Sequence, residues 1–187
     1  MFLRIEYIII FFIGCCQPLF SQGGSVRIAV YGGGNLEFVF NSMGDYNTGI
    51  TQTNWSLLGL EVNDDVALPN FTTWRLTMEA DDADADGFLT GLNPLNTLPF
   101  NAIEIRATVA AGCASCNTFG SPFVGLTAAP VVIADGGPAV GPPLVPGLAT
   151  ATDQLNISYR CGVAVSMLSG AADYYSDDIV FTLEMNP

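Results

Sequence analysis

Apolar and polar residues alternate along most of the chain between residues 26 and 185. The clearest runs are 26–30, 36–40, 58–62, 74–78, 103–107, 155–159 and 179–185. Strict alternation is typical of strands that bury one face, and glycine, proline, asparagine and aspartate separate the runs. No segment keeps a helical period for more than two turns. The pattern predicts an all-β fold, an Ig-like or jelly-roll β-sandwich, as a single domain over residues 22–187.

The longest irregular stretch is rich in proline and glycine and covers residues 135–147. The strands on its two sides share the same alternating style, and no internal repeat is visible. We therefore interpret the stretch as a loop or crossover within one domain.

The first 21 residues differ from the rest, because an uninterrupted apolar run from Ile8 to Cys16 follows the basic residue Arg4. A Gln-Pro pair ends this run before the ~20 apolar residues that a membrane span needs. The segment is therefore typical of a secretory signal peptide. We predict cleavage after Ser21, with cleavage after Cys16 as the alternative and lipid attachment at Cys15 as a further one. We expect a bacterial protein that passes the periplasm and is secreted or displayed at the cell surface.

Charge narrows the range of partners. The chain carries 18 acidic and 5 basic residues, with a net charge of −13, which repels nucleic acid and anionic lipid. No apolar run beyond the leader is long enough to span a membrane. The arginines that follow the leader fall on polar positions of predicted strands, where we expect them to reach water; they are Arg27, Arg75, Arg106 and Arg160.

Catalytic groups are scarce, because the chain has neither histidine nor lysine. Their absence excludes Ser-His-Asp and Cys-His catalysis, Schiff-base chemistry and histidine-ligated metals. A glycosidase that uses two carboxylates is the remaining enzymatic alternative. The glutamates that would serve it alternate with apolar residues on outward strand positions: Glu37, Glu61, Glu79, Glu104 and Glu184. We therefore predict a protein without enzymatic activity.

Three cysteines follow the leader, namely Cys113, Cys116 and Cys161. In an oxidising compartment an odd number predicts one disulfide and one remaining thiol. We predict a structural bridge from Cys161 to Cys113 or Cys116, and the alternative is a small loop closed between Cys113 and Cys116. Three thiols without histidine are too few for a closed zinc site.

One acidic loop is a candidate calcium site. Asp82, Asp84 and Asp86 stand at alternate positions before Gly87, and oxygen ligands in this spacing suit Ca²⁺ when the chain turns at a glycine. Asn93 stands where an EF-hand has its bidentate glutamate, so it is a weak ligand at most. A solvated acidic hairpin is the alternative interpretation. No other cofactor is indicated.

Aromatic residues supply a candidate for glycan binding. Trp55 and the pair Tyr174-Tyr175 are the freer candidates for stacking on a sugar, whereas Trp74 lies on an apolar strand position and is expected in the core. Packing within the domain is the alternative for all of them.

The two ends of the predicted mature chain resemble secreted fimbrial, pilin-like subunits of Gram-negative bacteria. Val26, Ile28 and Val30, flanked by glycines, resemble the donor segment of such subunits, and residues 179–185 resemble their last strand. The chain departs from that pattern because it lacks the usual penultimate tyrosine and places its predicted disulfide late. The resemblance implies an Ig-like fold and association by β-strand addition.

Two functions follow as hypotheses. The first is a non-catalytic, exported structural subunit that associates with its own kind or with another surface protein by strand addition. In this hypothesis residues 22–34 are either a donor strand or simply the first strand of the domain. The alternative is a calcium-stabilised module for carbohydrate binding or adhesion.

Overall fold

The computed structural model describes residues 2–6, 25–63, 73–82, 85–113, 116–118, 122–137 and 153–186. Within these ranges most residues form strands in several mainly antiparallel sheets, and the prediction of an all-β fold is confirmed. The helical part consists of α1 (Met43–Thr48) and the 3₁₀ turns η1 (Phe100–Ala102) and η2 (Met167–Ser169).

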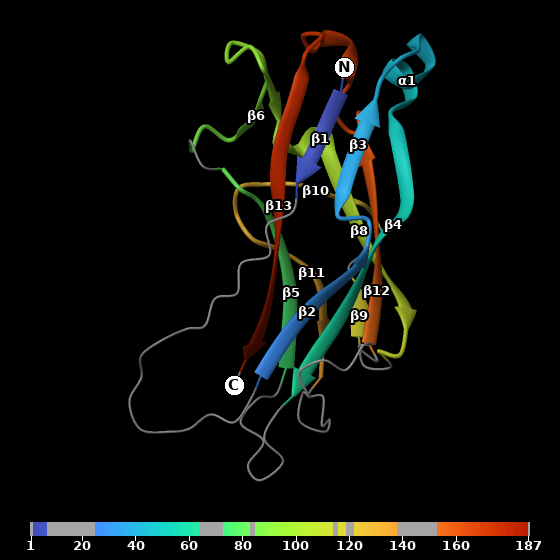
Figure 1. The fold of residues 1–187 in the computed structure, drawn as a ribbon, viewed down its shortest axis with the longest axis vertical. Coiled ribbons are helices and arrows are strands. Elements are labelled where there is room, and N and C mark those ends of the chain that lie inside the picture. Colours follow the sequence, from blue (N-terminus) through green and yellow to red (C-terminus); the bar gives the residue numbers. More distant parts are fainter. Residues whose placement is uncertain are drawn as a thin grey trace.

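Two large sheets run along the length of the molecule (Figure 1). The first has six strands in the order β3 (Asn35–Val39), β1 (Phe2–Glu6), β13 (Tyr174–Asn186), β5 (Thr73–Ala80), β11 (Val131–Gly136) and β9 (Cys116–Thr118). The second has five, in the order β10 (Val124–Gly125), β8 (Ile103–Ala111), β12 (Asp153–Cys161), β4 (Ile50–Asn63) and β2 (Ser25–Gly32). A separate hairpin pairs β6 (Phe88–Thr90) with β7 (Thr97–Pro99).

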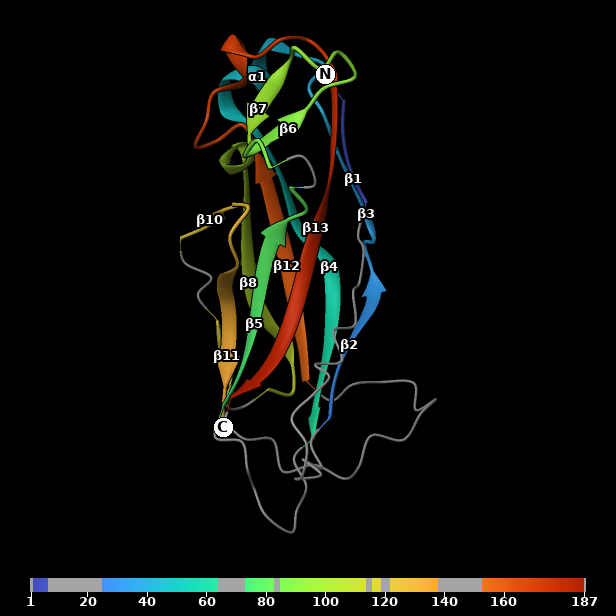
Figure 2. The same ribbon diagram turned by 90° about the vertical axis from the view of Figure 1, so that its left-hand side faces the viewer.

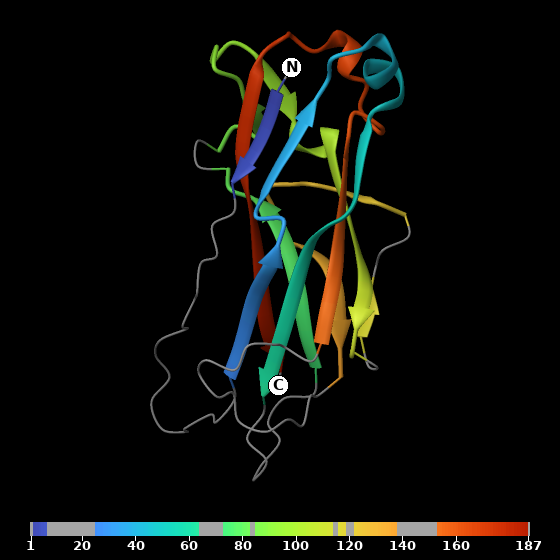
Figure 3. The same ribbon diagram turned by 45° about the vertical axis from the view of Figure 1, so that its right-hand side comes forward.

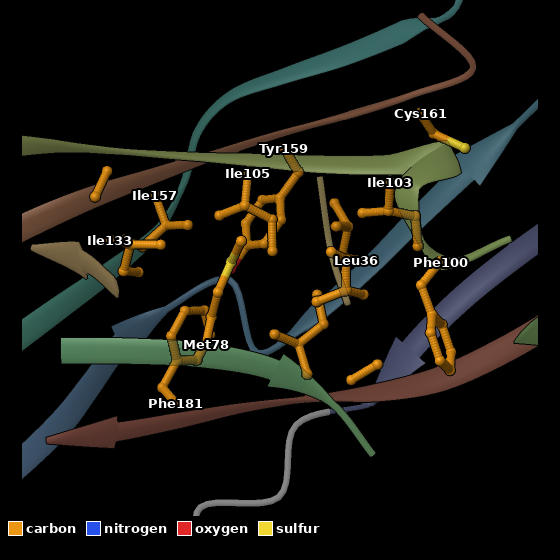
Figure 4. Close-up of a cluster of buried hydrophobic side chains, with 14 of the residues drawn as sticks. Leu36, Met78, Phe100, Ile103, Ile105, Ile133, Ile157, Tyr159, Cys161 and Phe181 are labelled. Carbon is orange, nitrogen blue, oxygen red and sulfur yellow. The ribbon is translucent and has the colours of Figure 1, made fainter. Parts of the chain in front are cut away.

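Apolar side chains from both large sheets share one core. Strand β3 shows the alternation directly, since Leu36 and Phe38 are fully buried while Asn35 and Glu37 are exposed. Figure 4 shows side chains of β5, β8, β12 and β13 meeting in this core, with Met78, Ile105 and Tyr159 among them. Burial of these side chains supplies the main favourable contribution to folding.

The chain passes from one large sheet to the other between β2 and β3 (Figure 3). Gly33 makes the turn with a φ of +70°, a conformation that disfavours residues with a Cβ atom. The Ser56 hydroxyl donates a hydrogen bond of 2.8 Å to the Gly33 carbonyl oxygen and ties this turn to β4. The predicted runs 26–30 and 36–40 therefore follow each other in sequence but belong to different sheets.

The short elements gather at one end of the molecule, where α1, η2 and the β6–β7 hairpin lie together (Figure 2). Helix α1 begins with a capping box, in which Ser42 accepts the Asp45 backbone N–H and the Asp45 carboxylate accepts the Ser42 N–H. This helix is only six residues long, which agrees with the absence of a longer helical period in the sequence.

Candidate functional site

Strand β1 occupies a position with hydrogen-bonded neighbours on both sides. It pairs antiparallel with β3 and parallel with β13, while β3 and β13 do not pair with each other. We call this position, between Asn35–Val39 and Tyr174–Asp178, the strand slot. Figures 1 and 3 show β1 lying between its two neighbours near one end of the sheet. The five residues of β1 therefore connect β3 to β13, two strands that are far apart in the sequence.

The inner positions of the slot border the core. Leu3 stands in register with Phe38 on one side and with Tyr175 on the other, and both of these neighbours are fully buried. Ile5 stands in register with Leu36, which is also fully buried, and with Asp177. A strand in the slot thus has apolar neighbours on both sides at the position of Leu3, and Leu36 and Asp177 as neighbours at the position of Ile5.

Charged residues mark the remaining positions of the slot. Arg4 stands in register with the exposed Glu37 of β3. Glu6 stands in register with Asp178 of β13, so two acidic residues are opposite each other. Opposite charges across neighbouring strands stabilise a sheet and like charges destabilise it. The register thus places a basic position of β1 opposite an acidic residue of β3, and an acidic position of β1 opposite an acidic residue of β13.

Asp177 is a half-buried carboxyl group at the edge of the slot. Its pKa is raised to about 7, mainly because burial disfavours the charged form, and the nearby carboxylates of Asp178, Asp81 and Asp82 raise it further. A hydrogen bond from the Asp178 backbone N–H to Asp177 acts in the opposite direction. The slot thus contains a group that gains or loses a proton close to neutral pH.

The segment in the slot belongs to the predicted signal peptide. Only its residues 2–6 are described, and they form β1. The candidate cleavage sites after Ser21 and Cys16, and the candidate lipidation site at Cys15, lie outside the described residues, so processing of the leader stays a prediction.

The predicted donor segment lies in β2, at the edge of the five-stranded sheet. Val26, Ile28 and Val30 are half-buried against the core, and β2 pairs antiparallel with β4 of the same chain. Arg27 donates to Glu61 of β4 through Nε at 2.7 Å and Nη2 at 2.5 Å, which reinforces this pairing. The structure therefore has this segment as an edge strand of its own sheet, and its role as a donor stays a prediction.

The cysteines pair differently from the prediction. A disulfide joins Cys113 to Cys116, and Cys161 is a free, buried thiol, so the expected bridge to Cys161 is wrong. The reason is topological, because Cys161 ends β12 in register with Ile103 at the start of β8, whereas Cys113 follows the far end of β8. Burial raises the pKa of the Cys161 thiol to about 12, so it is unreactive near neutral pH.

The acidic loop is described only in part. The Asp82 carboxylate accepts backbone N–H groups of Asp86 and Gly87, and Asp86 accepts that of Phe88. Asp84 lies outside the described residues. Asn93 sits in another loop, where its N–H binds Asp173. No group of three or more metal-ligating side chains occurs among the residues that the structure describes, and calcium binding at this loop stays a prediction.

The aromatic candidates for glycan binding are divided between the two sheets. Trp55 in β4 is 41% exposed and donates through Nε1 to the Asn35 carbonyl oxygen. Tyr174 and Tyr175 belong to β13, and Tyr175 is fully buried with its hydroxyl on the Ala171 carbonyl oxygen. Trp74 is buried in the core, as expected.

Sequence comparison adds no family to this picture: no family model matches the chain, and no curated protein is similar to it. Within the described ranges, none of the helices has the length and apolar character needed to cross a membrane. The candidate function therefore rests on the geometry of the strand slot.

Proposed function

We propose that the protein is an exported structural subunit, a pilin-like Ig-type β-sandwich without enzymatic activity, that assembles by accepting a β-strand in the slot between β3 and β13. The observation that carries this proposal is that a segment of the predicted leader, Phe2–Glu6, fills the slot. Cleavage of the leader would remove this strand from the middle of a sheet.

Removal of β1 leaves a specific vacancy. Strand β3 would lose its sole hydrogen-bonded neighbour among the described strands, and β13 would lose its strand partner on one side over residues 174–178. Unpaired strand edges readily pair with another chain. Apolar positions next to Leu36 and Phe38 would also be opened to water, and a strand with alternating apolar residues would cover them again.

A second copy of the chain carries a segment that fits. Val26-Arg27-Ile28 in β2 repeats the order of Leu3-Arg4-Ile5 in β1, with a basic residue between two aliphatic ones. Aligned in this way, Arg27 of the second copy would stand opposite Glu37. Ala29 would stand at the position of Glu6, in register with Asp178.

In such an exchange, β2 would leave its own sheet and enter the slot of a second copy. The move would increase the number of strands that pair with β2. In its own sheet β2 is an edge strand that pairs only with β4, whereas in the slot of another copy it would pair on both sides. The exchange breaks the Arg27–Glu61 ion pair, which is partly exposed, with side-chain exposures of 30% and 12%. Because both side chains are partly in contact with water, the attraction between them is screened, and loss of this pair opposes exchange only weakly.

The first experiment tests whether the slot accepts a strand. The processed chain is purified after export, its N-terminus is determined by mass spectrometry, and a peptide of residues 1–7 is added. We expect the peptide to bind and to reduce the size of assemblies in size-exclusion chromatography with light scattering. A matched peptide that is N-methylated at Leu3 and Ile5 lacks two backbone N–H donors that point to the same neighbouring strand. It cannot pair with that strand and should have no effect. Equal action of the two peptides would refute strand addition.

The second experiment tests whether β2 is the donor. Arg27→Cys with Glu61→Cys places two thiols on facing positions of β2 and β4, and their disulfide would lock β2 into its own sheet. We expect the oxidised double variant to remain monomeric while still binding the peptide of residues 1–7, and the reduced one to assemble. Wild-type protein with and without reductant controls for the Cys113–Cys116 bridge. Assembly of the oxidised variant would exclude β2 as donor without affecting the slot.

A further inference from the structure

A charged cluster lies on the outer face of the five-stranded sheet, away from the strand slot. Glu104 and Arg160 face each other across β8 and β12, with both guanidinium-to-carboxylate contacts at 2.7 Å. Phe123, which immediately precedes β10, lies against two guanidinium groups: its ring centroid is 4.4 Å from Cζ of Arg160 and 4.7 Å from Cζ of Arg106. Both distances are typical of cation–π interactions.

Arg106 is the unpaired member of this cluster. Each of the other strand arginines, Arg27, Arg75 and Arg160, forms an ion pair with a glutamate. Arg106 has no ion pair among the described residues, and its Nε is buried without a hydrogen-bond partner there. Buried donors in folded proteins nearly always have an acceptor, so an unsatisfied guanidinium N–H requires an explanation.

The cluster carries a local excess of positive charge. Two guanidinium groups face one carboxylate, and Glu104 already accepts three hydrogen bonds, two from Arg160 and one from the Ala164 backbone N–H at 3.2 Å. The sign of this local excess is opposite to the net charge of the chain, which is −13. Repulsion from distant acidic residues is screened beyond a Debye length of about 8 Å, so the nearby groups dominate.

Polar neighbours continue the face beyond Arg106. The register places Thr108 of β8 opposite Asn156 of β12, on the next rung of the same sheet face. Both residues are half-buried. A hydroxyl and an amide beside an unpaired guanidinium can donate further hydrogen bonds to an acceptor that reaches Arg106.

We infer that the Arg106–Phe123 face is a binding site for a carboxylate-bearing ligand. Because Nε is buried, a ligand would meet the terminal Nη groups of Arg106, whose N–H donors form a planar fork that matches the two oxygens of a carboxylate. Contact with Phe123 holds the plane of this fork in place before a ligand arrives. The carboxylate can belong to an acidic sugar or to an acidic side chain of a polypeptide.

The test follows the Arg106 side chain directly in the full processed protein. The Nε–Hε signals of the arginines are recorded by two-dimensional NMR during titration with glucuronate or with an acetyl-Asp-Glu-amide peptide. The uncharged probes glucose and acetyl-Asn-Gln-amide serve as controls. We expect the Arg106 signal to shift with at least one acidic probe. Which probe acts identifies the source of the carboxylate.

Two variants decide whether Arg106 is responsible. Arg106→Gln should weaken binding of the active probe by about tenfold or more, and Arg106→Lys, which keeps the charge but not the fork, should have an intermediate effect. Arg75→Gln removes an arginine from the other sheet and should leave the affinity unchanged. The site is refuted if neither acidic probe shifts the Arg106 signal, if the uncharged probes act equally, or if Arg106→Gln binds like the wild type.

Discussion

Glu104 is a carboxylate on the outward register of a strand that is nevertheless only 5% exposed. Alternation with Ile103 and Ile105 predicts a solvated side chain, and this expectation is wrong because other segments cover the outer face of β8 here. Arg160 contacts Glu104 at 2.7 Å, and the Ala164 N–H reaches it from the turn after β12. Local periodicity records which face of a strand turns inward, but it does not record whether a distant segment covers the other face.

Because the Glu104–Arg160 ion pair is largely buried, loss of one partner should lower the free energy of unfolding more than the same loss in an exposed pair. Glu104→Ala should lower the free energy of unfolding by about 3 kcal/mol, since it leaves the Arg160 charge partly buried without a partner. Glu184→Ala is the matched control, because Glu184 pairs with Arg75 at 43% and 47% side-chain exposure. The control should lose less than about 1 kcal/mol. Urea denaturation of both variants measures the difference, and equal losses would contradict the assigned burial.

Asp177 should make the stability of the leader-bearing chain depend on pH. Its pKa in the folded protein is about 7, mainly because of burial, whereas an unfolded aspartate has a pKa of about 3.9. Between these values the folded state keeps a proton that the unfolded state has released, so this group lowers stability as pH rises from about 4 to about 7. Asp177→Asn should therefore raise the melting temperature more at pH 8 than at pH 5.

A second variant isolates the neighbouring charges. Asp81→Asn removes one of the carboxylates that raise the pKa of Asp177 but leaves burial in place. It should reduce the pH dependence of the melting temperature without abolishing it. A gain for Asp177→Asn that is the same at pH 5 and pH 8 would show that Asp177 does not titrate in this range.

At the scale of elements, the crossing from β2 to β3 depends on one glycine. A Cβ atom at Gly33 would overlap the Trp55 carbonyl oxygen, and φ at this position is +70°. Gly33→Ala should therefore destabilise the fold by more than about 1 kcal/mol. At Gly32 and Gly34 a methyl group would meet no atom within 4 Å, so these positions provide neighbouring controls. Thermal denaturation of the three alanine variants checks this, and equal effects would contradict the crossing as described.

Strands are predictable where their identity is a local property. The runs at 74–78, 103–107 and 179–185 lie within β5, β8 and β13, because a strand with one buried face shows a period of two in its own sequence. Pairing is not local. Nothing in residues 25–39 indicates that β2 joins one sheet and β3 the other, and the register that separates Cys161 from Cys113 depends on how β8 and β12 align.

The candidate site is less predictable than the strands. The alternation of Val26, Ile28 and Val30 correctly suggests a strand, but the same pattern serves equally well for a donor and for an edge strand of the chain's own sheet. The slot itself arises from pairing between β1, β3 and β13 and has no signal in any single segment. Periodicity places Arg106 in water, and its unsatisfied Nε becomes visible only once Phe123 is placed over it.

At the scale of the whole molecule, the six-stranded sheet is complete only while the slot is filled. Strand β3 joins that sheet solely through β1 among the described strands, whereas β5 is paired on both sides by β13 and β11. Loss of the leader should therefore affect the two strands very differently. Hydrogen exchange reports this difference, because amide protection follows the stability of the local pairing.

We expect the β3 amides that face β1 to be protected in a chain that retains residues 1–21 and to exchange much faster in the processed monomer. The β5 amides should be protected equally in both chains and serve as the internal control. Adding the peptide of residues 1–7, or allowing the processed chain to assemble, should restore protection to β3 but not change β5. Equal protection of β3 with and without the leader would mean that core packing alone keeps β3 in place. That result would contradict the claim that the six-stranded sheet needs a strand in the slot.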